Sequence, residues 1–432
     1  MNTYLLTTLT KKAFEVERIQ NALAKAYEKG LNPKVIKRFC EPNYRGQIIY
    51  LIATNSYNIE PPREALIPKD GKKNEYRTVY INSPVDRVIC SLYNDAMCEL
   101  FSSMIHSSCK SYQKNLGVSQ VVTNISKYLG DLKCKPNETV LVKTDFSKFF
   151  DSVLIQYIDM CFNKMESLMN YQNGEAPDIN MFRRYYHSDI YFDLNGNVCK
   201  KYRSLQQGCA IGSFLANACL YELDEFMSKK YAQYVRYSDD CLIQSNNPHE
   251  VMNDINGITN KYGVVLNPEK VKAVKYDEWV KFLGFNIKQG YRTLSTQRVV
   301  KFKNKIKELT VNQKNITMKK ATRNVMNYLY GGEHCWADSC LATINVEEDI
   351  KQLNFFVMDC IKACGTKKKR IGGIGSTLDR KDYTIVRHGG RNVSSNMEKE
   401  EHIENYESMV CLWKALRQSK SLYKSLLLQV GM

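Results

Sequence analysis

The spacing of apolar and polar residues predicts an alternation of helices and strands over the first two thirds of the chain. Residues 11–40 have the pattern of an amphipathic helix pair with a break near Gly30. Residues 69–81 (KDGKKNEYRTVYI) combine a glycine-centred turn with alternating residues, which is typical of a β-hairpin. Residues 84–106 predict a helix, because Ser83 and the proline after it suit a first turn.

Shorter apolar runs further along predict strands around a long helix. Residues 139–145 (TVLVKTD) predict a buried strand, and residues 231–245 predict two short strands around a polar turn. Between them, residues 212–231 predict one strong helix that is apolar on one face. Residues 264–270 and 281–291 predict further strands. This alternation of strands and helices indicates the α+β class.

The pattern divides the chain into four parts. We expect an N-terminal helical extension over residues 1–60 and an α+β domain over residues 60–290. Residues 291–365 predict a helical part that is rich in lysine. A basic C-terminal helical region is expected over residues 366–432.

The charge balance points to a polyanionic partner. The chain of 432 residues has 62 Lys and Arg against 45 Asp and Glu, a formal net charge of +17. A surplus of this size favours phosphate contacts, as in nucleic-acid binding. The alternative is a basic surface that only meets water.

The cysteines and the hydropathy indicate a cytoplasmic protein. The 15 cysteines are irregularly spaced and many lie in apolar runs, where a free thiol packs as a small hydrophobe. The group around His334, Cys335 and Cys340 fits no standard zinc spacing. No apolar run is long enough to cross a membrane, and the N-terminus becomes charged too soon for a secretory signal.

Three acidic residues carry the candidate chemistry. Asp239 and Asp240 are adjacent in the polar turn between two strand-like runs, and Asp145 ends the apolar run before them in the chain. Like charges repel, so close carboxylates need compensation, and a divalent cation supplies it. Two cations held this way suit phosphoryl transfer. For Asp239 and Asp240 alone, the alternative is an exposed hairpin tip without a metal. A further acid, Asp151, is expected to cap the helix that follows it.

A glycine-rich segment lies between the acidic motifs. In QQGCAIGSFLAN at residues 206–217, Gly208 and Gly212 allow the backbone to approach a ligand closely, and Ser213 would open the helix. Taken alone, this pattern is common at helix N-termini. Its position after Asp145 and before Asp239 is what supports a functional role for this segment.

Seven motifs in this order resemble those of the reverse transcriptase family, in the bacterial group. The resemblance covers about residues 60–290 and rests on YRTVYINSPVDRVI (76–89), CKSYQKNLGVSQVV (109–122), DFSKFFDSV (145–153), QQGCAIGSFLAN (206–217), YSDD (237–240), LNPEK (266–270) and FLGF (282–285). It implies a right-hand polymerase fold. Fingers and palm (an antiparallel sheet with helices) would occupy residues 60–290, with a helical thumb over 291–365 and the C-terminal helical region after it.

The resemblance also implies metal and catalytic roles. Two Mg²⁺ ions, for which Mn²⁺ can substitute, would be held at Asp145, Phe146, Asp239 and Asp240. Lys270 would join the aspartates as a catalytic residue that protonates the leaving pyrophosphate. A lysine that only meets water after the Asn-Pro turn is the alternative for Lys270.

The nucleotide and nucleic-acid contacts follow from the same resemblance. The nucleotide site would comprise Lys69, Lys72, Arg77, Phe146, Phe149, Phe150, Gln207 and Gly208. Arg77 would bind the triphosphate, which suits a planar cation that is always charged, and Phe150 would exclude a 2′-hydroxyl. The primer grip would be Phe282, Leu283 and Gly284. The basic cluster Lys367, Lys368, Lys369 and Arg370 would bind nucleic acid.

Details of the motifs favour the stand-alone reverse transcriptases of bacterial antiphage defence. The motif QQGCAIGSFLAN (206–217) ends in IGSFLAN. Group II intron and retron enzymes usually have Ser-Pro in this part of the motif, and diversity-generating enzymes usually have Ser-Gln. FLGF occurs without the Val-Thr-Gly of retrons, and we find no HNH-like or RNase H pattern in the remaining sequence. The resemblance thus implies dNTPs, a DNA product and an RNA template, with a structured non-coding RNA as the expected template.

Three alternatives stay open at this point. The first is a diversity-generating or group II intron-like enzyme. The second is an RNA-dependent RNA polymerase, which Phe150 and the YSDD form disfavour. The third is a non-catalytic RNA-binding or toxin protein on a polymerase scaffold, which the three intact aspartates disfavour. The sequence leaves the primer and the oligomeric state open.

Overall fold

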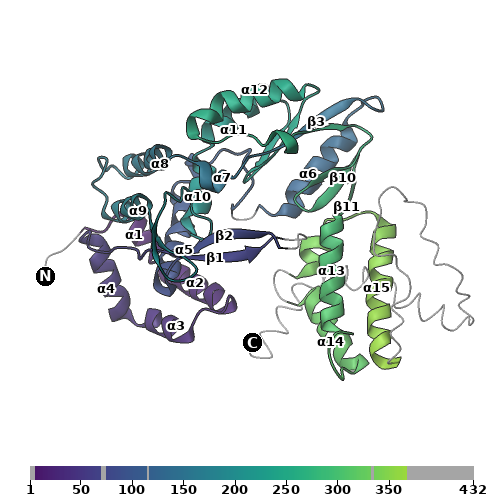
Figure 1. Ribbon diagram of the computed structural model, residues 1–432, viewed down its shortest axis with the longest axis horizontal. Helices are drawn as coiled ribbons and strands as arrows, with labels where there is room; N and C mark the ends of the chain where they lie inside the picture. The colour runs from purple at the N-terminus through teal and green to yellow at the C-terminus, as the bar shows by residue number, and fades with distance from the viewer. Residues whose placement is uncertain (1–4, 70–73, 114–115, 332–334, 367–432) are drawn as a thin grey trace, which may run out of the picture. The chain divides into compact units, whose positions relative to one another are not determined.

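The computed structural model describes residues 5–69, 74–113, 116–331 and 335–366 (Figure 1). The chain forms two compact units. The first comprises Met1–Leu116 with Glu138–Lys275, and the second comprises Gly117–Asn137 with the chain from Tyr276 onward. Both units combine helices with mainly antiparallel sheets, which confirms the predicted α+β class.

The first unit begins with four helices, shown in purple in Figure 1: α1 Thr8–Ala13, α2 Val16–Glu28, α3 Pro33–Cys40 and α4 Pro42–Ala53. The predicted helix pair over residues 11–40 is therefore three helices. Helix α3 starts where the break was expected, because Pro33 suits a first turn and Asn32 caps it. Helices α1 and α2 pack against α5, Pro84–Leu100, whose predicted N-cap Ser83 is confirmed.

A four-stranded sheet of the first unit contains the predicted hairpin. Strands β1 and β2 are antiparallel, and β1 is also joined to the hairpin of β4 and β5. That second hairpin was not predicted, although its Asn195–Gly196 pair is a typical hairpin signal. The strands are β1 Arg63–Pro68, β2 Tyr76–Ile81, β4 Ile190–Phe192 and β5 Val198–Lys200.

The other sheet of the first unit is antiparallel, in the order β6-β7-β3-β8. Its strands are β3 Thr139–Asp145, β6 Tyr234–Tyr237, β7 Asp240–Gln244 and β8 Lys272–Lys275. The predicted strand over residues 264–270 is wrong, since its end is the 3-10 turn Pro268–Lys270. Proline has no N–H for a sheet, and Asn267 caps the turn instead.

Helices complete the core of the first unit. They are α7 Phe149–Ser152, α8 Ile155–Leu168, α9 Pro177–His187, α10 Ile211–Ala218, α11 Tyr221–Lys230 and α12 Pro248–Thr259. The single helix predicted over residues 212–231 is two helices, with an interruption at Cys219 and Leu220. The apolar residues of both lie in one continuous core with those of α1 to α5.

The second unit places α6, Val118–Asp131, against a three-stranded antiparallel sheet. The sheet comprises β9 Val280–Phe282, β10 Phe285–Lys288 and β11 Tyr291–Leu294. Helices α13 Thr296–Leu309, α14 Met318–Tyr330 and α15 Glu347–Thr366 contact one another. The expected α+β domain over residues 60–290 does not coincide with one compact unit, because residues 117–137 and 276–290 belong to the second unit.

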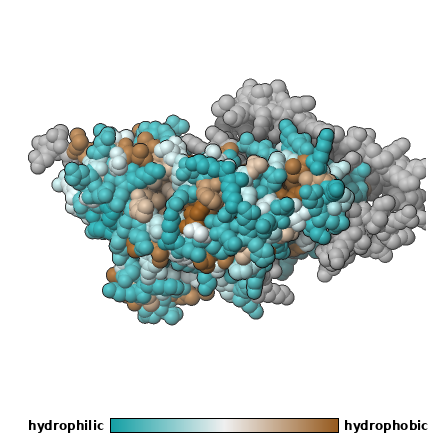
Figure 2. All heavy atoms as spheres, turned by 90° about the horizontal axis from the view of Figure 1, so that it is seen from above, coloured by the Kyte–Doolittle hydropathy of each residue, from teal (hydrophilic) through white to brown (hydrophobic). Residues whose placement is uncertain are grey.

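Several predictions concern general properties of the chain. No helix in the described ranges is long and apolar enough to cross a membrane. On the face shown in Figure 2, apolar residues occur in small separate groups among hydrophilic ones. The cysteines of the described ranges are free thiols. The basic cluster Lys367–Arg370 and the expected C-terminal helical region lie outside the described residues.

Candidate active site

The register of the β3–β7–β6 sheet brings the three aspartates together. Asp145 is the cross-strand partner of Asp240, and Asp240 is the partner of Tyr237 across the adjoining hairpin. Ser238 and Asp239 form the turn between the two strands, and the amide of Phe146 donates to the carbonyl oxygen of Asp239 at 3.3 Å. Side chains of directly paired residues lie about 5 Å apart at Cβ. The sequence therefore places two carboxylates side by side and the third in the turn beside them.

Two lysines engage this carboxylate group. Lys270 Nζ lies 2.6 Å from Asp145 Oδ1, and Lys143 Nζ lies 3.1 Å from Asp240 Oδ1. Lys270 is held close because the amide of Asn267 donates to the carbonyl oxygen of Asp145 at 2.9 Å. Lys143 was not predicted, but it stands two residues before Asp145 on a strand and therefore shares its face.

The third carboxylate, Asp239, lies in an environment that disfavours charge. Burial, followed by the nearby charges of Asp145 and Asp240, raises the pKa of Asp239 above its ordinary value. Oxygen-only donors with surplus negative charge are what Mg²⁺ and Mn²⁺ prefer. The donor set thus fits a divalent cation, although within the described ranges no three acidic, His or Cys side chains are already arranged as a metal-ligand group.

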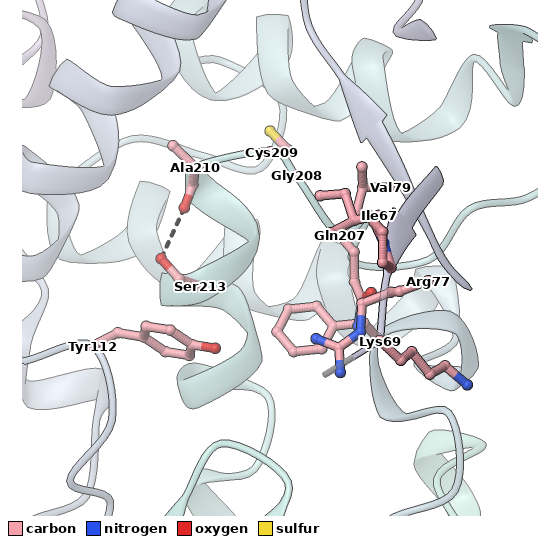
Figure 3. A pocket seen from close by; sticks show the side chains of 12 residues that line it. Ile67, Lys69, Arg77, Val79, Tyr112, Gln207, Gly208, Cys209, Ala210 and Ser213 are labelled. Atoms are coloured by element: carbon pink, nitrogen blue, oxygen red, sulfur yellow. Dashed lines mark hydrogen bonds between the residues drawn. The ribbon is translucent and has the colours of Figure 1, made fainter. Parts of the chain in front are cut away.

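A pocket of about 570 Å³ in the first unit contains most of the predicted nucleotide site (Figure 3). Lys69 and Arg77 reach it from the β1–β2 hairpin, and Gln207 and Gly208 reach it from the segment before α10. The lining consists of Ile67, Pro68, Lys69, Arg77, Val79, Tyr112, Phe150, Gln207, Gly208, Cys209, Ala210 and Ser213. Lys72 lies outside the described residues.

The three phenylalanines after Asp145 differ in position. Phe150 lines the pocket, and its contact with a nucleotide stays a prediction. The side chains of Phe146 and Phe149 are 1% and 2% exposed and pack in the core. Neither side chain lines the pocket. The expectation that these two rings contact the nucleotide is therefore corrected. Phe146 could contribute to a metal site only through its backbone carbonyl oxygen.

Gly208 was expected to let the backbone approach a ligand, and in the structure its close neighbour is another part of the protein. Its φ is +112°, and an added Cβ would lie 2.6 Å from the carbonyl oxygen of Tyr80 on β2. The amide of Tyr80 also donates to the carbonyl oxygen of Gln207 at 2.7 Å. The glycine therefore joins the segment before α10 to the β1–β2 hairpin, which positions both walls of the pocket.

Two predicted caps are wrong. Helix α10 begins at Ile211, so Ser213 lies inside its first turn, where its hydroxyl donates to the carbonyl oxygen of Ala210 at 2.8 Å (Figure 3). Asp151 lies inside the short helix α7 and caps neither α7 nor α8. Burial raises the pKa of the Asp151 carboxyl.

Tyr112 is a pocket residue that the sequence did not single out. Its side chain points into the pocket in Figure 3, and its hydroxyl lies 3.5 Å from the hydroxyl of Ser238 in the aspartate turn. Its φ of +53° is unusual for an aromatic residue. The motif CKSYQKN contained the residue, but nothing in that pattern indicated where its ring would point.

The predicted primer grip lies in the second unit. Phe282 ends β9 and is buried, and Leu283 and Gly284 form the turn to β10, both with positive φ. An added Cβ at Gly284 would collide with the side chain of Arg298. The turn is thus tightly defined, and its contact with a primer stays a prediction.

Comparison with known families agrees with this geometry. Residues 67–287, about half of the chain, match the model of the family described as reverse transcriptase (RNA-dependent DNA polymerase). The chain therefore belongs to the reverse transcriptase family. No curated protein matches the chain.

Solved telomerase structures show a distant likeness. Apo telomerase from Candida tropicalis, truncated from the C-terminal domain, is 13% identical with a TM-score of 0.40, over 55% of this chain and 56% of that one. Telomerase from Candida albicans in complex with a TWJ fragment of telomeric RNA is 12% identical with a TM-score of 0.42, over 87% and 68%. Apo telomerase from Candida tropicalis is 13% identical with a TM-score of 0.43, over 70% and 57%. The chain thus spans little more than half of the first of these proteins.

Proposed function

We propose that this chain copies RNA into DNA by two-metal-ion nucleotidyl transfer at Asp145, Asp239 and Asp240. The observation that carries the proposal is the strand register, which pairs Asp145 with Asp240 and puts Asp239 in the adjoining turn. Two bound Mg²⁺ ions, or Mn²⁺ in their place, would stabilise charge on both the attacking and the leaving oxygen. Lys270 and Lys143 hold two of the carboxylates in position.

The pocket supports a role for its residues in binding the incoming dNTP. Arg77 and Lys69 offer positive charge to the triphosphate, and a guanidinium can bind phosphate oxygens in a bidentate way. Phe150, Gln207 and Gly208 line the same pocket. Phe150 would supply bulk against a 2′-hydroxyl, and Gln207 and Gly208 would border the base and the template. Lys270, 2.6 Å from Asp145, is the candidate proton donor to pyrophosphate.

Primer extension on an RNA template tests the proposed chemistry. The double variant Asp239→Ala with Asp240→Ala should lose dNTP incorporation and keep its circular dichroism spectrum. Glu225→Ala is the matched control, because this acid lies exposed on α11 and forms its ion pair with Lys229. Synthesis by the double variant at the parent's rate would contradict the catalytic assignment.

The template we propose is a dedicated structured non-coding RNA, copied in bacterial antiphage defence. The support is the net charge of +17, which favours a continuously bound polyanion, and the motif details that resemble stand-alone defence enzymes. Expressed with its native flanking DNA, the protein should co-purify with one abundant RNA and give phage resistance that requires Asp239. Purification without a specific RNA, with resistance unchanged in Asp239→Ala, would contradict this role and leave the polymerase chemistry untouched.

A further inference from the structure

The turn that carries Asp239 has a backbone conformation that needs support. Ser238 has a φ of +58°, in the left-handed region that residues with a Cβ rarely adopt. Such strain persists only where the surrounding structure enforces it. The three neighbouring carboxylates add mutual repulsion. Something in the fold must therefore hold this turn in place.

The first support binds the amide of the turn. Ser238 N donates to Ser111 Oγ at 2.9 Å, and that hydroxyl donates its own proton to Asn217 Oδ1 at 2.8 Å. Asn217 Nδ2 returns a bond to the carbonyl oxygen of Ser111 at 2.8 Å. The side chains of Ser111 and Asn217 are fully buried, so no water competes for these bonds.

The second support binds the carbonyl of the same residue. Arg236 Nη1 donates to the carbonyl oxygen of Ser238 at 3.1 Å, and Nη2 donates to the carbonyl oxygen of Asn217 at 3.2 Å. Asp224 holds the guanidinium through two bonds of 2.7 and 2.6 Å, and Tyr234 donates to the same carboxylate at 2.7 Å. Arg236 and Asp224 are both fully buried. A buried ion pair is tolerable only with such complete bonding.

The backbone around Ser111 ties this network to strand β6. Arg236 N donates to the carbonyl oxygen of Ser108 at 3.0 Å, and Lys110 N donates to the carbonyl oxygen of Arg236 at 2.8 Å. The segment thus runs beside β6 like a short extra strand. Its next residue, Tyr112, lines the nucleotide pocket.

We infer that Ser111, Asn217, Arg236 and Asp224 are positioning residues of the active site. They clamp both peptide groups of Ser238 and thereby fix the direction in which Asp239 leaves the turn. None of the four touches the reacting atoms. The inference rests on the proposed function only in so far as Asp239 holds a cation; the clamp itself is a property of the fold.

The test removes one hydroxyl from the clamp. In Ser111→Ala, hydrogen exchange at the Ser238 amide should become roughly tenfold faster or more, because that N–H loses its buried acceptor. Mn²⁺ binding without nucleotide, followed by electron paramagnetic resonance, should weaken by roughly fivefold, and kcat should fall about tenfold with KM for dNTP near the parent value. Ser111→Cys, with a weaker acceptor, should be intermediate.

Ser126→Ala is the matched control, because it also removes a fully buried hydroxyl but in helix α6 of the second unit. It should lower Tm about as much as Ser111→Ala while leaving Mn²⁺ affinity and exchange at residues 237–240 unchanged. Unchanged exchange and Mn²⁺ affinity in Ser111→Ala would overturn the inference. A parent protein without polymerase activity would instead count against the proposed function, and the exchange result would still decide on the clamp.

Discussion

At the scale of single residues, Asp239 shows how the active site works against stability. Its pKa is raised in the folded chain, first by burial and then by Asp145 and Asp240. The folded state therefore binds this proton more tightly than the unfolded state. The free energy of unfolding then falls as pH rises from the ordinary carboxyl pKa through the raised value, and the whole penalty is present only above the raised value.

Replacing this carboxylate should stabilise the metal-free protein. In EDTA at pH 7.5, we expect Asp239→Asn to raise Tm by about 1–3 °C, because it removes a destabilising charge. Added Mg²⁺ should raise Tm of the parent more than Tm of the variant, since a ligand stabilises the state that binds it. Asp193→Asn is the control: hydrogen bonds from Asn197 lower the pKa of Asp193, so this change should not stabilise. A lower Tm for Asp239→Asn in EDTA would contradict the assigned sign.

Sugar selection is the second property that one residue should decide. Phe150 lines the pocket, and its carbonyl oxygen accepts from Leu205 N at 3.0 Å, which fixes the backbone beneath the ring. Phe150→Ala should reduce the preference for dNTP over rNTP, measured as the ratio of kcat/KM, by about 10- to 100-fold. Tyr112→Phe keeps the ring and loses only the hydroxyl, so it should keep the parent's preference. Equal discrimination by parent and Phe150→Ala would place the selection elsewhere.

At the scale of elements, the joint between the β1–β2 hairpin and the segment before α10 is the least tolerant point of the pocket. Gly208→Ala would put a Cβ 2.6 Å from the Tyr80 carbonyl oxygen at a φ of +112°. We expect this variant to lose more than about 1 kcal/mol of stability and to raise KM for dNTP more than it lowers kcat, because the pocket walls separate.

A second glycine provides the control for that prediction. Gly257 lies inside helix α12, and an added Cβ there would meet no atom within 4 Å. Gly257→Ala should therefore stabilise the protein by about 0.5–1 kcal/mol in urea unfolding, because alanine is the better helix former. If both variants changed stability alike, the contact with Tyr80 would not be the cause.

The elements that the sequence predicts well are those whose signal is local. Strand β3 and the β6–β7 hairpin follow from apolar runs around acidic turns, and the β1–β2 hairpin follows from alternation. The sequence predicts one helix over 212–231, and not two, because the apolar face continues through Cys219 and Leu220. The backbone break depends on packing, which a pattern of apolar positions does not contain.

The same distinction applies to the site. Asp145, Asp239 and Arg77 lie inside motifs that can be read one at a time. Ser111 and Tyr112 matter because a distant turn and pocket lie against them, and contacts between residues more than 100 positions apart leave no local pattern. The buried side chains of Phe146 and Phe149 illustrate the same limit, because proximity to Asp145 in the chain does not determine on which side a ring packs.

At the scale of the whole molecule, the family match and the compact units do not coincide. Residues 67–287 take in most of the first unit and also α6, β9 and β10 of the second. The chain passes between the units at 116–117, 137–138 and 275–276. The second unit is built from two separate stretches of the chain, so it can finish folding only after both stretches have been synthesised.

The net charge of +17 belongs to the molecule as a whole and should dominate RNA binding. Each phosphate contact contributes roughly 0.7 to the slope of log affinity against log salt for a single strand, so we expect a steep loss of affinity between 50 and 200 mM KCl, on the order of 10³-fold. Fluorescence anisotropy with a labelled RNA measures this slope. A slope near zero would show that the charge surplus does not face the RNA.

The same salt titration tests whether the basic cluster Lys367–Arg370 contacts the RNA backbone. Changing Lys367, Lys368, Lys369 and Arg370 together to alanine should reduce the slope by roughly 0.7–0.9 for each phosphate that the variant no longer binds. The control replaces Lys229, Lys230 and Lys261, three lysines that pair with carboxylates on the described surface. Those cations are already partly neutralised, so their removal should change the slope much less. If both sets lowered the slope equally, binding would depend on net charge alone and the cluster would have no specific contact with the RNA backbone.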